Sequence, residues 1–142
     1  TDVRNLGAIA RSAECAGANG LIIPQQGSAP INQDAIKTSA GALLRLPVCR
    51  INNLKTFVNT IKAHDIKIYS ASEKANALYT QINASEPLML VMGSEESGVS
   101  PTMLKMSDEL VKIPMKGEIE SLNVSAAASI LLFEVVRQRL GI

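Results

Sequence analysis

The chain has 142 residues, of which 46% are hydrophobic and 19% are charged, and its formal net charge is +1. No apolar run approaches the ~20 residues needed to cross a bilayer, so the composition describes one soluble globular domain, which we expect in the cytoplasm. A net charge this close to zero excludes a protein that holds nucleic acid by electrostatics alone. Any RNA binding must therefore use local basic residues, a dimer surface or a partner segment.

The first half of the chain predicts helices and short apolar strands in alternation. The spacing of Leu6, Ile9 and Ala13 is helical, and Gly17 is a typical helix stop. Asn32 follows the polar loop QQGSAP and suits the cap of a second helix. The predicted elements are, in order, a helix over 5–16, a strand over 20–23, the loop 25–30, a helix over 32–39, a strand over 48–51 and a helix over 52–62.

The second half continues this alternation. Residues 66–71 alternate in polarity and predict a strand. Residues 88–92 form an unbroken apolar run that stops at Gly93, which is typical of a strand buried on both faces. The remaining predicted elements are a helix that starts at Ser100-Pro101, a strand over 109–114, and a long helix from Val124 on which Ala128, Leu131 and Val135 share a face.

Because strands and helices alternate almost throughout, the predicted class is α/β with a mainly parallel sheet. Ligands of such sheets bind beyond the carboxyl ends of the strands. We therefore expect three loops at strand ends to converge on a site: the loop over residues 93–98, the turn after Ile113, and the loop that contains Ser121-Leu122-Asn123.

The loop over residues 93–98 reads GSEESG and lacks the GxGxxG fingerprint of dinucleotide-binding proteins. Glu95 and Glu96 would repel a pyrophosphate, so a ligand with a positive centre, or one recognised through its base and sugar, suits the loop better. Taken alone, the loop is more simply a solvated acidic turn. Ser121 and Asn123 likewise suit helix capping, and a lone helical arginine such as Arg11 is usually solvated or ion-paired.

The residues that bind metals or form disulfides are few. Cys15 and Cys49 have apolar neighbours and are expected to be buried free thiols. Together with His64 they show no metal-ligand spacing, so no metal site is predicted, and His64 is expected to be exposed at a helix end. The methionines that we expect in the core are Met89, Met92 and Met103.

Three segments nevertheless form a set: NLGAIARSAE (5–14), LVMGSEESGVS (90–100) and IPMKGEIESLNVSAAASILLFE (113–134). In order and spacing they resemble the three motifs of the SpoU/TrmH RNA ribose methyltransferases, which belong to the SPOUT class. The resemblance covers essentially the whole chain, and SLNVS before a helix is its most specific part. The third segment and the ending VRQR are most similar to bacterial enzymes that methylate a guanosine ribose of 23S ribosomal RNA.

This resemblance implies that the protein transfers a methyl group from S-adenosylmethionine to a ribose 2′-hydroxyl in RNA. It also implies a deep trefoil knot near the C-terminus, which ordinary topology rules would not suggest, and an obligate homodimer that packs through the knot and the C-terminal helix. The implied cofactor contacts, mainly backbone groups, are at Gly93, Ile113, Met115, Leu122 and Asn123. The implied polar active-site residues are Asn5, Arg11, Glu95, Ser121 and Asn123.

The resemblance also implies roles for these residues. Arg11 would first orient the ribose or a flanking phosphate, because arginine gives up its proton reluctantly. Glu95 would fix Arg11 or Asn5. Leu122 would present its backbone to the cofactor while its side chain packs, and the polar residues on either side would hold that loop.

Some features depart from the family's pattern. Val3 stands where the first motif commonly has proline, and the strand expected before Asp2 is missing, as is an N-terminal RNA-binding domain. We therefore expect a fragment that contains the catalytic domain. Two other activities remain open, a transfer RNA ribose methyltransferase and a resistance enzyme that acts on ribosomal RNA. A third alternative is a non-catalytic RNA-binding or ribosome-assembly module.

Overall fold

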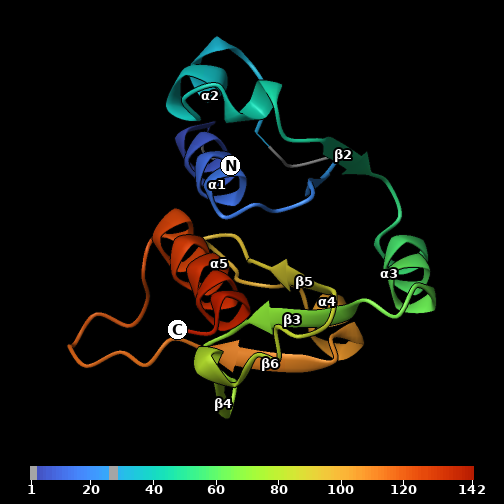
Figure 1. Cartoon of the computed structure of the whole chain (residues 1–142), viewed down its shortest axis with the longest axis vertical. Helices are drawn as coiled ribbons and strands as arrows, with labels where there is room; N and C mark the ends of the chain where they lie inside the picture. The colour runs from blue at the N-terminus through green and yellow to red at the C-terminus, as the bar shows by residue number, and fades with distance from the viewer. Residues whose placement is uncertain (1–2, 26–28) are drawn as a thin grey trace. The chain divides into compact units, whose positions relative to one another are not determined.

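The computed structural model describes residues 3–25 and 29–142 (Figure 1). Part of the predicted loop over residues 25–30 falls on residues 26–28 and lies outside the described residues. The chain divides into two compact units, Thr1–Leu54 and Lys55–Ile142. We describe each unit by itself.

The N-terminal unit contains two parallel strands and the helices that accompany them. Its elements are α1 (Val3–Cys15), β1 (Leu21–Pro24), α2 (Gln33–Thr38), the 3₁₀ helix η1 (Ala42–Leu44) and β2 (Val48–Ile51). β1 pairs with β2 in register from Leu21–Val48 to Pro24–Ile51. Helices α1 and α2 approach closely at Gly7, where a Cβ atom would lie 2.7 Å from the Ala35 carbonyl oxygen. Only glycine allows this approach without displacing the backbone.

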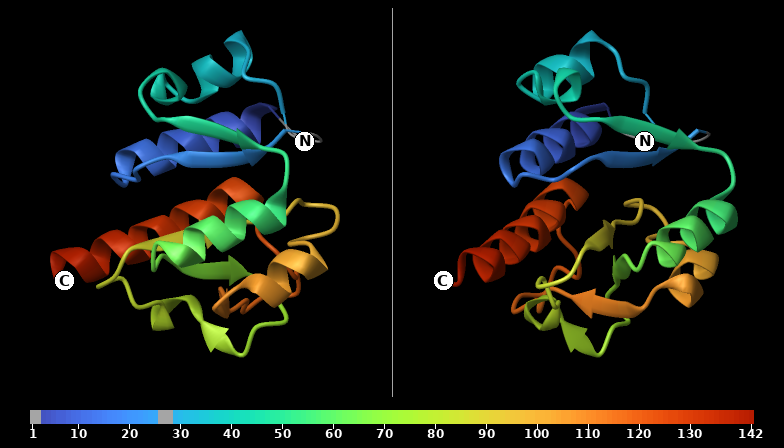
Figure 2. Two further views of the ribbon diagram at one scale, coloured as in Figure 1. Left: turned by 90° about the vertical axis from the view of Figure 1, so that its right-hand side faces the viewer. Right: turned by 45° about the vertical axis from the view of Figure 1, so that its right-hand side comes forward.

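The C-terminal unit contains a four-stranded parallel sheet in the order β4-β6-β3-β5. Its long helix packs on this sheet, because Leu131 and Val135 of the helix share a core with Tyr69 and Val111 of the strands (Figure 2). The elements are α3 (Leu54–Ala63), which begins at the unit boundary, β3 (Lys67–Ala71), β4 (Ala77–Leu78), η2 (Tyr79–Gln81), β5 (Leu88–Val91), α4 (Pro101–Met106), β6 (Glu109–Lys112) and α5 (Val124–Leu140).

The predicted α/β class and the parallel pairing are confirmed, and so are the main elements, to within a few residues at their ends. The caps read from the sequence are also confirmed. The side chains of Asn32, Ser100 and Asn123 accept backbone hydrogen bonds from Ala35, Met103 and Ser125, respectively. Short β4 and the two 3₁₀ helices were not predicted, because elements of two or three residues have no periodicity to detect.

Three burial predictions are wrong. Cys15 and Cys49 are free but exposed. On α1 the buried face contains Ala10 and Ala13, and Cys15 lies about 200° around the helix from Ala13. The residues of β5 are only partly buried, where an apolar run predicted burial on both faces. The three methionines expected in the core differ: Met103 is buried, Met92 is partly buried and packs against the core, and Met89 is only partly buried.

Other sequence expectations concern polar residues and membranes. His64 is exposed, as predicted. Among residues 3–25 and 29–142, no three His, Cys, Asp or Glu side chains group in a way that could hold a metal ion. Within the same ranges, no helix has both the length and the apolar character that a membrane span requires.

Candidate functional site

The candidate site lies at the carboxyl edge of the parallel sheet in the C-terminal unit. Strand β3 lies between β5 and β6, with Ser70 opposite Val91 and Ala71 opposite Val111. The three strands therefore end level with one another. The loop after β5 and the segment after β6 leave the sheet from the same edge, on either side of β3, which is where ligands of such sheets bind.

The loop after β5 is closed on itself by hydrogen bonds. The Gly98 N–H donates to the Ser94 carbonyl at 2.9 Å, and the Ser94 N–H donates to the Gly98 carbonyl at 3.3 Å. Gly98 has a φ of 69°, in the left-handed region that favours glycine. At Gly93 a Cβ atom would lie 2.2 Å from the Gly98 carbonyl carbon, so no side chain fits there. The two glycines allow a tight turn that presents Glu95 to solvent.

Asn123 joins this loop to the start of α5. Its Nδ2 atom donates a hydrogen bond of 2.8 Å to Oε1 of Glu95, 28 residues away in sequence. Its Oδ1 atom accepts two hydrogen bonds from Ser125, one from the backbone N–H at 2.9 Å and one from the hydroxyl. The side chain of Asn123 therefore both caps the helix and binds a carboxylate on another loop.

The segment between β6 and α5 forms a long loop that extends away from the sheet (Figure 1). Ile113 packs against the core, whereas the side chains of Met115, Ile119 and Leu122 are 37%, 81% and 41% exposed. Leu122, whose side chain is expected to pack, is thus only partly covered within this chain. Residues 113–122 lie outside helices and strands, whereas the Asn123 carbonyl accepts the first hydrogen bond of α5, from the Ala127 N–H at 3.0 Å.

Two predicted site residues, Asn5 and Arg11, belong to the N-terminal unit and lie on α1. Arg11 is exposed and Asn5 is half-buried. The burial of Leu6 and Ala10 fixes which face of α1 is turned to the core. The other predicted residues belong to the C-terminal unit, namely Gly93, Glu95, Ile113, Met115, Ser121, Leu122 and Asn123, and among these the structure joins Glu95 directly to Asn123.

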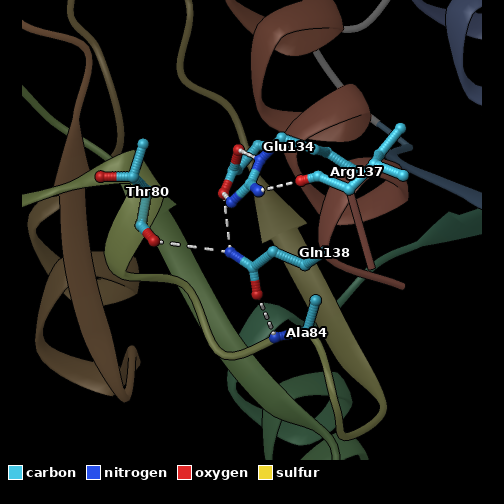
Figure 3. A network of polar contacts seen from close by, with 6 residues as sticks. Thr80, Ala84, Glu134, Arg137 and Gln138 are labelled. Carbon is cyan, nitrogen blue, oxygen red and sulfur yellow. Dashed lines mark hydrogen bonds and ion pairs between the residues drawn. The ribbon is translucent and has the colours of Figure 1, made fainter. Parts of the chain in front are cut away.

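The far end of α5 is anchored by a buried carboxylate that the sequence did not reveal (Figure 3). Glu134 is 6% exposed and accepts hydrogen bonds from Arg137 Nε at 2.8 Å and Gln138 Nε2 at 2.8 Å. The hydrogen bond from Arg137 is the largest influence and lowers the pKa of Glu134, although burial opposes this. Gln138 Oε1 also accepts from the Ala84 N–H at 3.0 Å, so the network fixes α5 against a neighbouring loop.

Ser125 is a further residue of the site that sequence analysis did not single out. The available signal was the spacing, because a serine two residues after a helix-capping asparagine is placed to bond the asparagine side chain.

Comparisons with known proteins identify the family. A family model described as the SpoU rRNA Methylase family matches residues 1–133. The chain is 43% identical over 140 residues to the "23S rRNA (guanosine-2'-O-)-methyltransferase RlmB" of Xanthomonas axonopodis pv. citri (strain 306), covering 99% of this chain and 56% of the relative. It is 40% identical to an "Uncharacterized tRNA/rRNA methyltransferase" of Mycolicibacterium paratuberculosis (strain ATCC BAA-968 / K-10), covering 99% of this chain and 46% of the relative.

A solved structure is similar over the whole fold. The SpoU methyltransferase AviRb from Streptomyces viridochromogenes, in complex with the cofactor AdoMet, superposes with a TM-score of 0.93 at 30% sequence identity. The match covers 100% of this chain and 58% of that one. The chain thus spans about half the length of the curated relatives that it matches.

Proposed function

Since the chain belongs to the SpoU rRNA methylase family, we propose that it transfers a methyl group from S-adenosylmethionine to a ribose 2′-hydroxyl in RNA, and that residues 1–142 form the catalytic domain. The match at 43% identity over 140 residues to a 23S rRNA guanosine-2′-O-methyltransferase carries this proposal. It favours a guanosine of 23S ribosomal RNA as the substrate. We also expect the protein to act in the cytoplasm, where ribosomal RNA is assembled into ribosomes.

The residues at the sheet edge fit S-adenosylmethionine. Residues 113–123 offer backbone donors and acceptors next to exposed apolar side chains. The exposed carboxylates of Glu95 and Glu96 complement a sulfonium and disfavour a phosphate. The groups proposed to hold the cofactor are the backbones of Gly93, Ile113, Met115, Leu122 and Asn123. When bound, the cofactor supplies a methyl group on a positively charged sulfur that is already electrophilic.

The polar residues are assigned to the RNA. Arg11 is exposed on α1, and the planar guanidinium of an arginine suits a phosphate or ribose, so it is assigned to orienting the ribose or a flanking phosphate. Glu95 is held by Asn123 and is assigned, as Asn5 is, to the polar residues of the active site. Ser121 contacts the substrate from the exposed loop before α5. Alignment of this kind supplies up to about 7–11 kcal/mol of a barrier.

The proposal extends to the knot and to assembly. We propose that loop 113–123 and the start of α5 belong to a trefoil knot of the kind expected for this family. We propose that the protein is a homodimer that packs through this region and α5. Phe133 on α5 is 46% exposed, although Leu131 and Val135 of the same helix are buried, which leaves an apolar side chain for a second copy.

The test is a methyl-transfer assay with radiolabelled S-adenosylmethionine and separated, unmodified ribosomal and transfer RNA. We expect label in 23S rRNA, at a guanosine whose 3′ linkage becomes resistant to alkaline hydrolysis. Binding of S-adenosylhomocysteine, measured by calorimetry, is the matched control for folding. A protein that binds S-adenosylhomocysteine and labels no RNA would support the alternative of a non-catalytic RNA-binding or assembly module.

A second candidate substrate is transfer RNA. The 40% identity to a relative whose name covers both tRNA and rRNA favours this second candidate. Label in the transfer RNA fraction, with none in ribosomal RNA, would select this alternative.

A further inference from the structure

The orientation of the Asn123 amide is determined from two sides. Its oxygen faces two donors of Ser125, the backbone N–H and the hydroxyl, while its NH₂ group faces the Glu95 carboxylate. A reversed amide would place NH₂ against the Ser125 N–H and an oxygen against a carboxylate. Both contacts are repulsive, so Ser125 and Glu95 select the same orientation.

The carboxylate of Glu95 depends on this orientation. The backbone of its loop is fixed by the hydrogen bonds between Ser94 and Gly98, but an exposed glutamate side chain has several rotatable bonds. The Asn123 N–H at 2.8 Å restricts the carboxylate to one region. A hydrogen bond to a charged group is stronger than one between neutral groups, so this contact restrains the Glu95 carboxylate.

We propose that Ser125 is a positioning residue of the methyl-transfer site: it fixes the Asn123 amide, and through that amide the Glu95 carboxylate. This inference rests on the proposed function and adds a residue to it. Ser125 touches neither substrate nor cofactor in this role. Its hydroxyl contributes one of the two hydrogen bonds to the Asn123 oxygen, so its loss weakens the preference for one amide orientation by roughly three- to tenfold.

The first arm of the test is independent of catalysis. In ¹H–¹⁵N NMR spectra of the purified protein, the side-chain NH₂ signals of Asn123 are assigned by their absence in Asn123→Asp. We expect these signals to shift when Glu95→Gln is introduced. The shift should be much smaller when Ser125→Ala is already present, and it should be kept with Ser125→Thr, which retains the hydroxyl. Two outcomes would overturn the proposal. One is that Glu95→Gln shifts the Asn123 signals equally with and without the Ser125 hydroxyl. The other is that Glu95→Gln, introduced as the only substitution, does not shift them.

The second arm uses turnover. Ser125→Ala should lower kcat roughly three- to tenfold, with KM for S-adenosylmethionine unchanged, and Ser125→Thr should restore it. Ser129→Ala is the matched control, because it removes a hydroxyl one turn further along α5, where it donates to the Ser125 carbonyl. We expect Ser129→Ala to retain kcat. A loss with Ser129→Ala equal to that of Ser125→Ala would mean a general effect on the helix, against the proposal.

A double substitution separates positioning from an independent effect. If Ser125 acts through Glu95, Ser125→Ala should cause no further loss of kcat in a Glu95→Gln background. Multiplicative losses would contradict the proposal. If the unmodified protein methylates no RNA, the proposed function fails, and the NMR arm still decides whether Ser125 fixes Asn123 and Glu95.

Discussion

Arg137 and Glu134 form a two-point ion pair within one turn of α5, with Nε to Oε1 at 2.8 Å and Nη2 to Oε2 at 3.0 Å. The two partners are unequally exposed, because the carboxyl side chain is 5% exposed and the guanidinium side chain is 50% exposed. Arg137 also donates to the carbonyl of Ile142 at 2.7 Å. The pair therefore closes the end of α5 while one partner remains in solvent.

The free energy of unfolding should depend on the ionisation of Glu134. Its pKa is lowered in the folded protein, mainly by the hydrogen bond from Arg137. The resulting stabilisation is complete above the ordinary glutamate pKa of about 4.3 and is lost as the pH falls through the lowered value. Urea unfolding is measured from pH 7 downward. The difference in the free energy of unfolding between the unmodified protein and Glu134→Gln should shrink as the pH falls below about 4.3 and through the lowered pKa. The exposed Glu73→Gln is the control and should show no such convergence.

Replacement of Gln138 by alanine should destabilise the C-terminal unit. Gln138 satisfies both the Ala84 N–H and the buried Glu134 carboxylate. The loss should be about 1–3 kcal/mol, because a partly buried donor and a buried acceptor each lose a partner. The midpoint of urea unfolding measures it, with Gln33→Ala, an exposed glutamine at the start of α2, as the control. Equal midpoints for the two variants would contradict the role given to Gln138.

Gly93→Ala should open the loop after β5. The added Cβ would lie 2.2 Å from the Gly98 backbone, so the loop must move, and Glu95 with it. We expect binding of S-adenosylhomocysteine, measured by calorimetry, to weaken about tenfold or more, which corresponds to about 1.4 kcal/mol. Gly117→Ala is a matched control, since a Cβ at Gly117 has no atom within 4 Å among the described residues. Unchanged affinity in Gly93→Ala would argue against cofactor binding at this loop.

Arg11→Ala should lower methyl transfer by about 100-fold or more, because a misplaced hydroxyl reacts far more slowly. Binding of S-adenosylhomocysteine should survive, because Arg11 is assigned to the RNA. Arg45→Ala removes another exposed arginine of the N-terminal unit and should retain activity. Normal methylation by Arg11→Ala would show that its assignment is wrong.

Phe133→Glu should disrupt the proposed homodimer. A charge at an apolar contact on α5 is costly to desolvate, so we expect a monomer at micromolar concentration in sedimentation velocity. Leu44→Glu is the control, because Leu44 is 74% exposed in the N-terminal unit, on the 3₁₀ helix η1. A monomeric unmodified protein would remove the basis of this prediction.

The sequence by itself determined three helix caps and the strands of four residues or more. Asn32, Ser100 and Asn123 cap helices through groups two or three residues away, so the information is local. The three-motif pattern also identified the family, and the matching family model confirms that resemblance. The order and spacing of the three motifs can be read from the sequence without knowing which of their residues are in contact.

Only the tertiary structure decided which side chains meet. The contact between Asn123 and Glu95 joins residues 28 positions apart, and it depends on the level ends of parallel strands. The burial of Glu134 and the exposure of Cys15 were equally invisible, because each depends on which face of its helix is turned to the core. Periodicity predicts that a helix has a buried face, whereas packing against other elements determines where that face ends and which polar groups find partners within it.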